Sequence, residues 1–247
     1  MDGTALYAAL FANWFLAGIA GGAAAIGTGM AAMPVLILLL CPADIVLVGM
    51  LGCLVASLHL AYSYREGFRW GDMKPLCLGC LPGIAAGTFT LKVVSASTLQ
   101  FILGFVLLSF IVFQMLRRYR LGRLSDSPTV GFLAGVACGF AGAAAAVPGA
   151  PLGVYVILRG WDTDRSRGNM SVFFVLINSV TIFAHATTGL YTGHVMAMGL
   201  ACSIGGLLGQ CIGVRIGRGM ATSVLHMFIL VFICIASCML FWRAFGL

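Results

Sequence analysis

The sequence predicts an all-α, polytopic integral membrane protein that consists of two inverted repeats. Three observations predict this fold: the composition, a duplicated motif and the placement of the basic residues. Of the 247 residues, 61% are hydrophobic and 9% are charged, and the mean hydropathy is +1.07. Such a chain has too little polar surface to cover a water-soluble globule, so we expect it to lie in a membrane.

A six-residue motif occurs twice along the chain. FLAGIA begins at Phe15 and FLAGVA begins at Phe132, and each opens a run rich in glycine and alanine. Pro34 and Pro151 follow the two motifs at the same distance. An internal duplication of this kind is typical of transporters that bind their substrate where the two halves meet. The predicted parts are a first membrane repeat, a cytoplasmic basic linker and a second membrane repeat, at residues 1–118, 119–128 and 129–247.

Apolar runs fill both halves between the polar breaks. The runs are 13–40, 45–64, 75–91 and 99–116 in the first half and 130–158, 171–189, 195–214 and 224–242 in the second. As one straight helix, residues 13–40 would measure on the order of 40 Å, against a hydrocarbon core of about 30 Å, and glycines and Pro34 interrupt them. We therefore expect the first run of each half to break into two pieces of roughly a dozen residues that form a re-entrant hairpin.

The fourteen Lys and Arg residues distinguish a hairpin from a plain crossing. If both first runs cross as full spans, the basic residues divide almost evenly between the two sides of the membrane. If both are hairpins, only Lys92 and Arg243 fall outside the cytoplasm, as the positive-inside rule requires. Each half then has three full spans, an odd number, so the repeats are inverted. Eight full spans in parallel repeats are the alternative.

The two hairpin tips form the predicted anion site. A helix N-terminus carries unpaired N–H groups and behaves like about half a positive charge, so in a low dielectric it attracts anions. Glycine lets the backbone approach a ligand closely. The predicted substrate-binding residues of the two tips are Gly27, Thr28, Gly29, Pro148, Gly149 and Ala150. The alternative function of such glycines is close helix packing, which we favour for spaced pairs such as Gly83 with Gly87 and Gly205 with Gly209.

A polar stripe follows each hairpin. Asn178, Thr181 and His185 recur at helical spacing and share one face. The repeat aligns Ala56, His59 and Ser63 with these three positions. Because polar groups in lipid are costly, we expect both faces to point inward, towards a central cavity. The predicted substrate contacts on them are His59, Ser63, Asn178, Thr181 and His185, with proton exchange at a histidine. The alternative is that these side chains only link helices inside the core.

Other chemistry has little support in the sequence. None of the seven acidic residues lies well inside a predicted span, so the carboxylate relay of proton-driven pumps is missing. No Ser/His/Asp arrangement or H-E-x-x-H motif appears, so we predict no enzyme, no catalytic residue, no metal and no cofactor. Cys77 and Cys80 form a C-x-x-C pair that would suit an intramembrane thiol-disulfide relay, although cysteines scattered through apolar runs are typical of small core residues.

Two further expectations concern the ends of the segments. The charged cluster Asp162, Asp164, Arg165 and Arg167 is expected to be a solvated loop with local ion pairs. The four tryptophans, Trp14 among them, lie near segment ends and are expected to anchor the protein at the membrane interfaces.

In their order and duplication, these motifs resemble the sulfite exporter TauE/SafE family. The similarity rests on the repeated FLAG motif, on Gly27-Thr28-Gly29 ahead of Pro34, on Gly71-Asp72 ahead of Pro82-Gly83-x-x-x-Gly87, and on Gly193-His194 ahead of Gly205-Gly206-x-x-Gly209. The resemblance implies a multi-pass permease of the bacterial inner membrane for small, often sulfur-containing anions such as sulfite, sulfoacetate and other organosulfonates. At the second tip, family members tend to have a glycine cluster, whereas this chain has alanines at positions 143 to 146.

The sequence therefore predicts an alternating-access permease whose partners are a small anion and membrane lipid. The basic residues lie in short loops and not on one face, so no nucleic-acid partner is expected. The sequence leaves a homo-oligomer open. The rival functions are the thiol-disulfide relay and a membrane assembly subunit that transports nothing.

Overall fold

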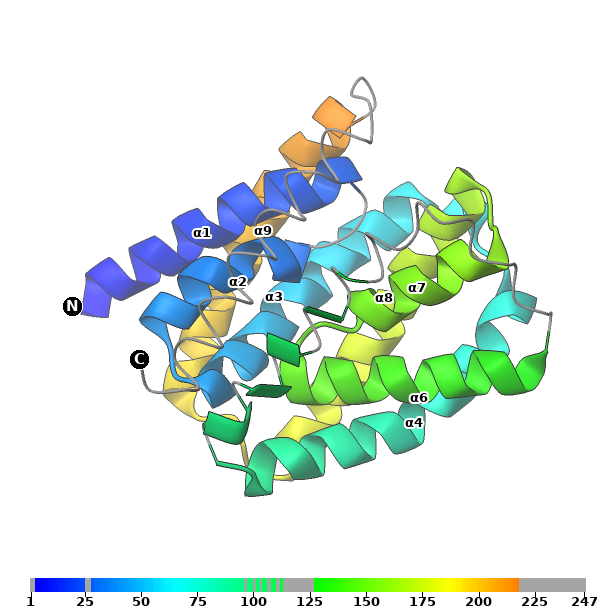
Figure 1. Ribbon diagram of the computed structural model, residues 1–247. Helices are drawn as coiled ribbons and strands as arrows, with labels where there is room; N and C mark the ends of the chain where they lie inside the picture. Colours follow the sequence, from blue (N-terminus) through cyan, green and yellow to red (C-terminus); the bar gives the residue numbers. More distant parts are fainter. Residues whose placement is uncertain are drawn as a thin grey trace.

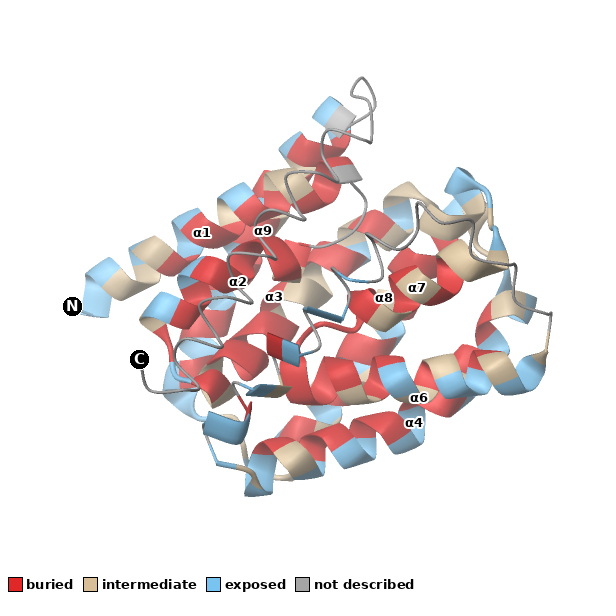
Figure 2. Ribbon diagram, in the orientation of Figure 1, coloured by how far each residue is buried: buried red, intermediate tan, exposed pale blue. Residues whose placement is uncertain are grey.

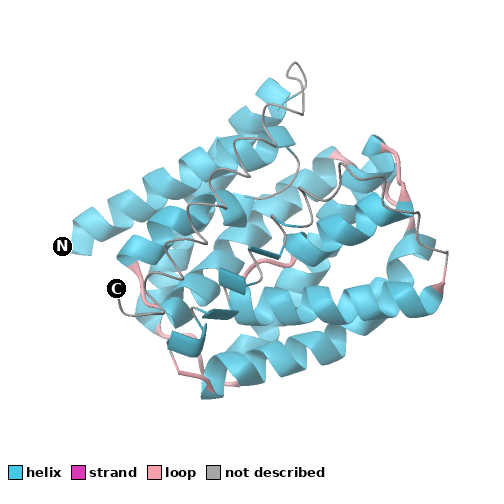
Figure 3. Ribbon diagram, in the orientation of Figure 1, coloured by secondary structure: helices cyan, strands magenta, loops and turns pink. Residues whose placement is uncertain are grey.

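The computed structural model describes residues 3–24, 28–95 and 127–217, together with 97–99, 101, 102, 104, 105, 108, 109 and 112. Gly27, the predicted span at 224–242, most of the span at 99–116 and nearly all of the basic linker lie outside the described residues. The part of the chain that is described contains helices and no strand, which confirms the all-α prediction (Figure 3).

Eight α-helices and one 3-10 turn are described (Figure 1). The first half contains α1 (Gly3–Ala24), α2 (Thr28–Leu39), α3 (Pro42–Ser63), η1 (Arg65–Gly67) and α4 (Trp70–Val93). The second half contains α6 (Pro128–Ala145), α7 (Gly149–Arg159), α8 (Thr163–Thr187) and α9 (Gly193–Gly217). Six of these helices are long and apolar enough to cross a membrane, whereas α2 and α7 are too short. With 12 and 11 residues, α2 and α7 measure about 18 Å and about 16 Å.

The first run of each half folds back on itself, as predicted. In the first half, the Asn13 side chain donates to the carbonyl of Ala32 at 3.0 Å, and Gly21 lies against Thr28. Residue numbers thus fall along α1 as they rise along α2, so the two helices are antiparallel. In the second half, Gly142 lies against Pro148 in the same way, and α6 packs on α7.

The first limb of each hairpin is longer than the predicted dozen residues. α1 has 22 residues and α6 has 18, so both are among the six helices long enough to cross a membrane, and the prediction that each first limb reaches only half the depth was wrong in length. α1 begins at Gly3, ahead of the apolar run, because the segment that precedes Asn13 is rich in alanine and leucine and favours a helix. α6 begins at Pro128, which is well placed in the first turn, where its missing N–H has no partner to lose.

The two repeats are inverted. The equivalent helices α3 and α8 touch at Ser57 and Asn178, whose side chains lie 3.3 Å apart. Beyond the end of α3, Gly67 lies against Asp164 and Gly168 near the start of α8. Residue numbers therefore rise along α3 as they fall along α8. Equivalent helices that run in opposite directions relate the two halves by inversion, as the charge distribution predicted.

The halves interlock through glycines. α1 packs along α9, and α6 packs along α4, so the first helix of each half lies on a later helix of the other (Figure 1). At Gly209 the carbonyl of Phe15 occupies the place that a Cβ atom would take, and at Gly83 the carbonyl of Val136 does the same. These spaced glycines therefore serve close helix packing.

The pattern of buried and exposed residues on the helices is the one expected of a protein surrounded by lipid. The inner faces of the helices are buried and their outer faces are exposed (Figure 2). The exposed residues include many large apolar side chains. Leu16 is 66% exposed and Phe183 is 71% exposed. In a membrane these side chains face lipid. The expectation for Trp14 was wrong: its side chain is fully buried because it packs on Gly52 of α3 instead of reaching an interface.

Candidate anion-binding site

The two hairpin tips meet at a cavity of about 50 Å³. The first turn of α2 and residues 146–149 of the second tip line it, and α3 and α8 complete the wall. The lining residues are Thr28, Gly29, Met30, Cys53, Ala56, Ser57, Leu60, Ala146, Val147, Pro148, Gly149, Phe174 and Asn178. Five of the predicted site residues are therefore brought together by the structure, and they come from both repeats.

At the first tip, the N-terminus of α2 packs on α3 at Gly29. The Cys53 sulfur lies against the backbone of Gly29. A Cβ atom at position 29 would overlap Cys53 Sγ, so a larger residue here would require the Cys53 side chain to shift. The first tip therefore presents the start of a helix and a thiol to the cavity.

At the second tip, α6 ends with Ala146 in the left-handed conformation, at φ 55° and ψ 24°. The N–H of Ala146 donates to Gly142 at 2.8 Å, and that of Val147 donates to Ala141 at 3.2 Å, a hydrogen-bond pattern that usually has glycine at the left-handed position. For a residue with a Cβ atom this conformation costs about 1–2 kcal/mol. The alanine in place of the usual glycine therefore leaves the helix end intact and puts a methyl group against Gly49 of α3.

The first turn of α7 offers fewer free N–H groups than the sequence suggests. Pro148 and Pro151 have no N–H, while Ala150 and Leu152 donate to the carbonyls of Val147 and Pro148 at 3.3 Å and 3.4 Å. Within the described chain, Gly149 is the residue of this turn whose N–H has no such partner. Gly149 also lines the cavity, so its N–H is the backbone donor that the second tip leaves available there.

Asn178 and Ser57 join the two repeats on the cavity wall. The Asn178 amide nitrogen lies 3.3 Å from Ser57 Oγ, which itself donates to the carbonyl of Cys53 at 2.6 Å. Asn178 is 1% exposed, and its carbonyl oxygen Oδ1 has no hydrogen-bond partner among the described residues. An unpaired acceptor at this depth is costly unless a ligand or water completes it.

The rest of the polar stripe on α8 faces inward, as expected, but does not reach this cavity. Thr181 and His185 are both fully buried. The His185 ring approaches the backbone of Ala143 on α6, and the ring of Tyr191 lies 6.4 Å away between centroids. Ala150 is also buried, one residue beyond the cavity wall.

The two predicted residues on α3, His59 and Ser63, lie one helical turn apart and outside the cavity lining. His59 Nε2 is 3.8 Å from the Cys211 sulfur of α9, and Ser63 donates to the carbonyl of His59 at 2.8 Å. Neither side chain lines the cavity in this conformation. Among the residues placed by the structure, the cavity lining carries no charged side chain.

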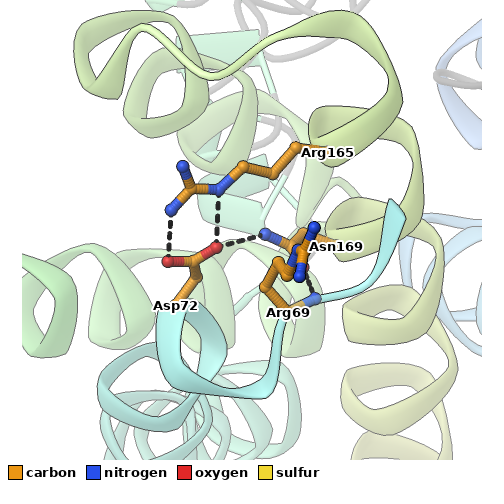
Figure 4. Close-up of polar contacts among 4 residues, drawn as sticks. All are labelled: Arg69, Asp72, Arg165 and Asn169. Atoms are coloured by element: carbon orange, nitrogen blue, oxygen red, sulfur yellow. Dashed lines mark hydrogen bonds and ion pairs between the residues drawn. The ribbon is translucent and has the colours of Figure 1, made fainter. Parts of the chain in front are cut away.

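The structure adds a polar cluster that the sequence interpretation missed (Figure 4). Arg165 of α8 donates from Nε and Nη2 to the two carboxylate oxygens of Asp72 on α4, at 2.7 Å and 2.6 Å. Asn169 also donates to Asp72, at 3.0 Å, and accepts from the backbone N–H of Arg69 at 2.7 Å. This cluster of Arg69, Asp72, Arg165 and Asn169 ties α4 of the first repeat to α8 of the second.

The expectation of a solvated loop with local ion pairs was therefore wrong for Arg165. The segment is the start of α8, because Asp162 caps the helix by accepting from the backbone N–H of Arg165 at 2.8 Å. The Gly71-Asp72 pair, noted for its place in the motif order, was the sequence signal that could have identified the partner carboxylate.

In the described part of the chain, six helices of spanning length and two half-length helices define a multi-pass membrane protein with inverted hairpin repeats. The family model described as Sulfite exporter TauE/SafE matches residues 10–240, so the chain belongs to this family of membrane anion transporters. The comparisons found no match among curated proteins and none among solved structures.

Proposed function

We propose that this protein moves a small, sulfur-containing anion across the bacterial inner membrane by alternating access, and binds it between the two hairpin tips. One observation carries the proposal: two helix N-termini from opposite repeats meet at a buried cavity that also presents Ser57 and Asn178. Membership of an anion-transporter family supports the same class of cargo.

The polarity of the site favours anions over cations. The starts of α2 and α7 each contribute about half a positive charge, and most residues of the lining are buried, so these partial charges are weakly screened. The neutral lining avoids burying a full cationic charge, which would be costly when the site is empty. A cavity of about 50 Å³ suits an ion of a few heavy atoms, such as sulfite. Longer organosulfonates would require the cavity to widen.

The inverted repeats supply a mechanism for access from either side. Rocking of one half against the other would expose the shared site first to one face and then to the other. The hydrogen bond between Ser57 and Asn178 crosses between the halves at the site, and the Asp72–Arg165 pair crosses between them near the starts of α4 and α8. Contacts of this kind would break and re-form during transport.

The test is anion binding and flux with purified protein. Isothermal titration with sulfite, thiosulfate, methanesulfonate and acetate, followed by sulfite flux in liposomes, should show selective binding of sulfur oxyanions. Asn178→Leu and Ser57→Ala should weaken binding at least tenfold. Thr88→Val is the matched control, because Thr88 is also a buried hydroxyl without a described partner but lies outside the cavity. Folded wild-type protein that binds no anion, or site variants that bind as the control does, would overturn the proposal.

The thiol-disulfide relay is the second candidate. Cys80 is buried, and its thiol donates to the carbonyl of Cys77 at 3.1 Å, a bond within one helix that a core cysteine commonly makes. Replacing both cysteines with serine should leave anion flux unchanged if the protein is a permease. Loss of function in that variant, or purified protein without flux for any anion, would favour the relay or an assembly role respectively.

A further inference from the structure

The orientation of the Asn178 amide is fixed by its neighbour. A serine hydroxyl has one hydrogen, and Ser57 uses it towards the carbonyls of Cys53 and Leu54, at 2.6 Å and 3.0 Å. Ser57 Oγ can therefore only accept from Asn178. The group of Asn178 that faces Ser57 must be its NH₂, and the amide cannot be flipped without setting two acceptors against each other.

This orientation gives the site an acceptor where an anion site needs donors. The Asn178 carbonyl oxygen is buried and has no partner among the described residues, while Asn178 lines the same cavity as the N-terminus of α7. A fully deprotonated oxyanion would bring one of its oxygens against this oxygen and repel it. An anion that keeps one hydroxyl would instead donate to it.

We infer that the cavity selects a hydrogen-bearing monoanion: the hydroxyl of a hydrogen oxyanion donates to Asn178 Oδ1, and its unprotonated oxygens accept from the Gly149 N–H and the N-terminus of α2. The inference rests on the proposed function and names its substrate class. The transported ion brings its own proton. This agrees with the placement of the described acidic residues, which lie at helix ends or connections and not beside the cavity.

The test uses two probes of equal charge and similar size. The monoanion of selenite carries a hydroxyl, whereas methanesulfonate has a methyl group in that place and no ionisable proton. Isothermal titration of the full purified chain across a pH series should show at least tenfold tighter binding of selenite than of methanesulfonate where selenite is a monoanion. Above its second ionisation, the selenite affinity should fall about tenfold per pH unit, as expected when one proton enters with the ion.

Because methanesulfonate has no ionisable proton, any pH dependence of its binding reports the titration of a group on the protein. The titratable side chains near Asn178 are Cys53 on the cavity wall, His59 on α3 and His185 further along α8. If one of them controlled binding, both probes would follow the same pH profile. If the affinity for methanesulfonate does not change with pH while the affinity for selenite falls, the proton that controls binding belongs to the ion and not to the protein.

Variants locate the effect. Asn178→Leu should remove the preference for selenite over methanesulfonate, whereas Thr88→Val, the control, should retain it. If wild-type protein binds methanesulfonate or sulfate as tightly as selenite, the inference is overturned while the proposed anion site stands. If it binds none of these ions, the proposed function is overturned as well. The inference and the proposed function are both tested with wild-type protein alone, so a variant that fails to fold does not affect either test.

Discussion

Arg165 and Asp72 lie 93 residues apart and form a two-pronged ion pair in which both carboxylate oxygens accept from one guanidinium group. The pair belongs to different repeats, and Asp72 is only 13% exposed. Asn169 extends it to the backbone of Arg69, so that a single carboxylate fixes the start of α4 against the start of α8.

The first prediction concerns the strength of this pair. Asp72→Ala and Arg165→Ala should each destabilise the protein, and a double-mutant cycle should give a coupling free energy of about 1–2 kcal/mol, since the pair is bidentate but Arg165 is 39% exposed. Thermal unfolding in detergent is the measurement. Arg167→Ala serves as the control, because Arg167 stacks on Tyr64 and does not touch Asp72. Additive effects of the two substitutions would contradict the prediction.

The second prediction concerns the left-handed residue at the second tip. Ala146→Gly removes about 1–2 kcal/mol of backbone strain and loses the burial of one methyl group, so its stability should equal or exceed that of the wild type. Ala144→Gly, two residues earlier in α6, should instead lose about 1–2 kcal/mol, because that position is helical and fully buried. Equal losses of unfolding free energy in the two variants would refute this account of Ala146.

The third prediction concerns the glycine interfaces. Gly83→Ala and Gly209→Ala should each lose about 1–3 kcal/mol of stability, because the new methyl group would overlap a carbonyl oxygen of the facing helix. Gly71→Ala has open space around it and lies in the first turn of α4, so it should be neutral or slightly stabilising. Melting temperatures of the three variants, measured side by side, decide the point.

The fourth prediction uses two native thiols. Cys53 lines the cavity, whereas Cys41 is exposed at the connection before α3. In a variant that retains only these two cysteines, a saturating anion should slow maleimide labelling of Cys53 several-fold and leave Cys41 unchanged. Burial and the hydrogen bond to Asp44 raise the pKa of Cys41, so this thiol stays neutral to higher pH and labels faster in alkaline buffer. Equal protection of both thiols would count against the cavity as the binding site.

The hairpins could be predicted from the sequence because their signal is local. The duplicated motif, the glycines and the prolines all lie within the runs that fold back, and the charge distribution then favoured inversion. The Asp72–Arg165 pair could not be predicted in this way. Local sequence places Arg165 beside Asp162 and Asp164, whereas its partner depends on how two distant helices pack.

The polar stripe on α8 shows how far helical periodicity alone can predict a binding site. Helical spacing correctly predicts that Asn178, Thr181 and His185 share a buried face, but it does not give the depth at which the hairpin tip meets that face. The tip lies level with Asn178, and His185, two turns later, packs on α6 instead. The acceptor left on Asn178 could be found only once the hydrogen bonds of Ser57 were known.

Because the two repeats are inverted, the Asp72–Arg165 pair at one end of the molecule has an equivalent position at the other end. The repeat places His194 opposite Asp72 and Ala43 opposite Arg165, and His194 is instead 3.2 Å from the Tyr7 hydroxyl. The first position thus holds an ion pair between the repeats, whereas the equivalent position holds the contact between His194 and the Tyr7 hydroxyl. The two repeats thus share their helices but not this polar contact. If the protein alternates its access as proposed, its two conformations would differ in free energy even without a bound anion.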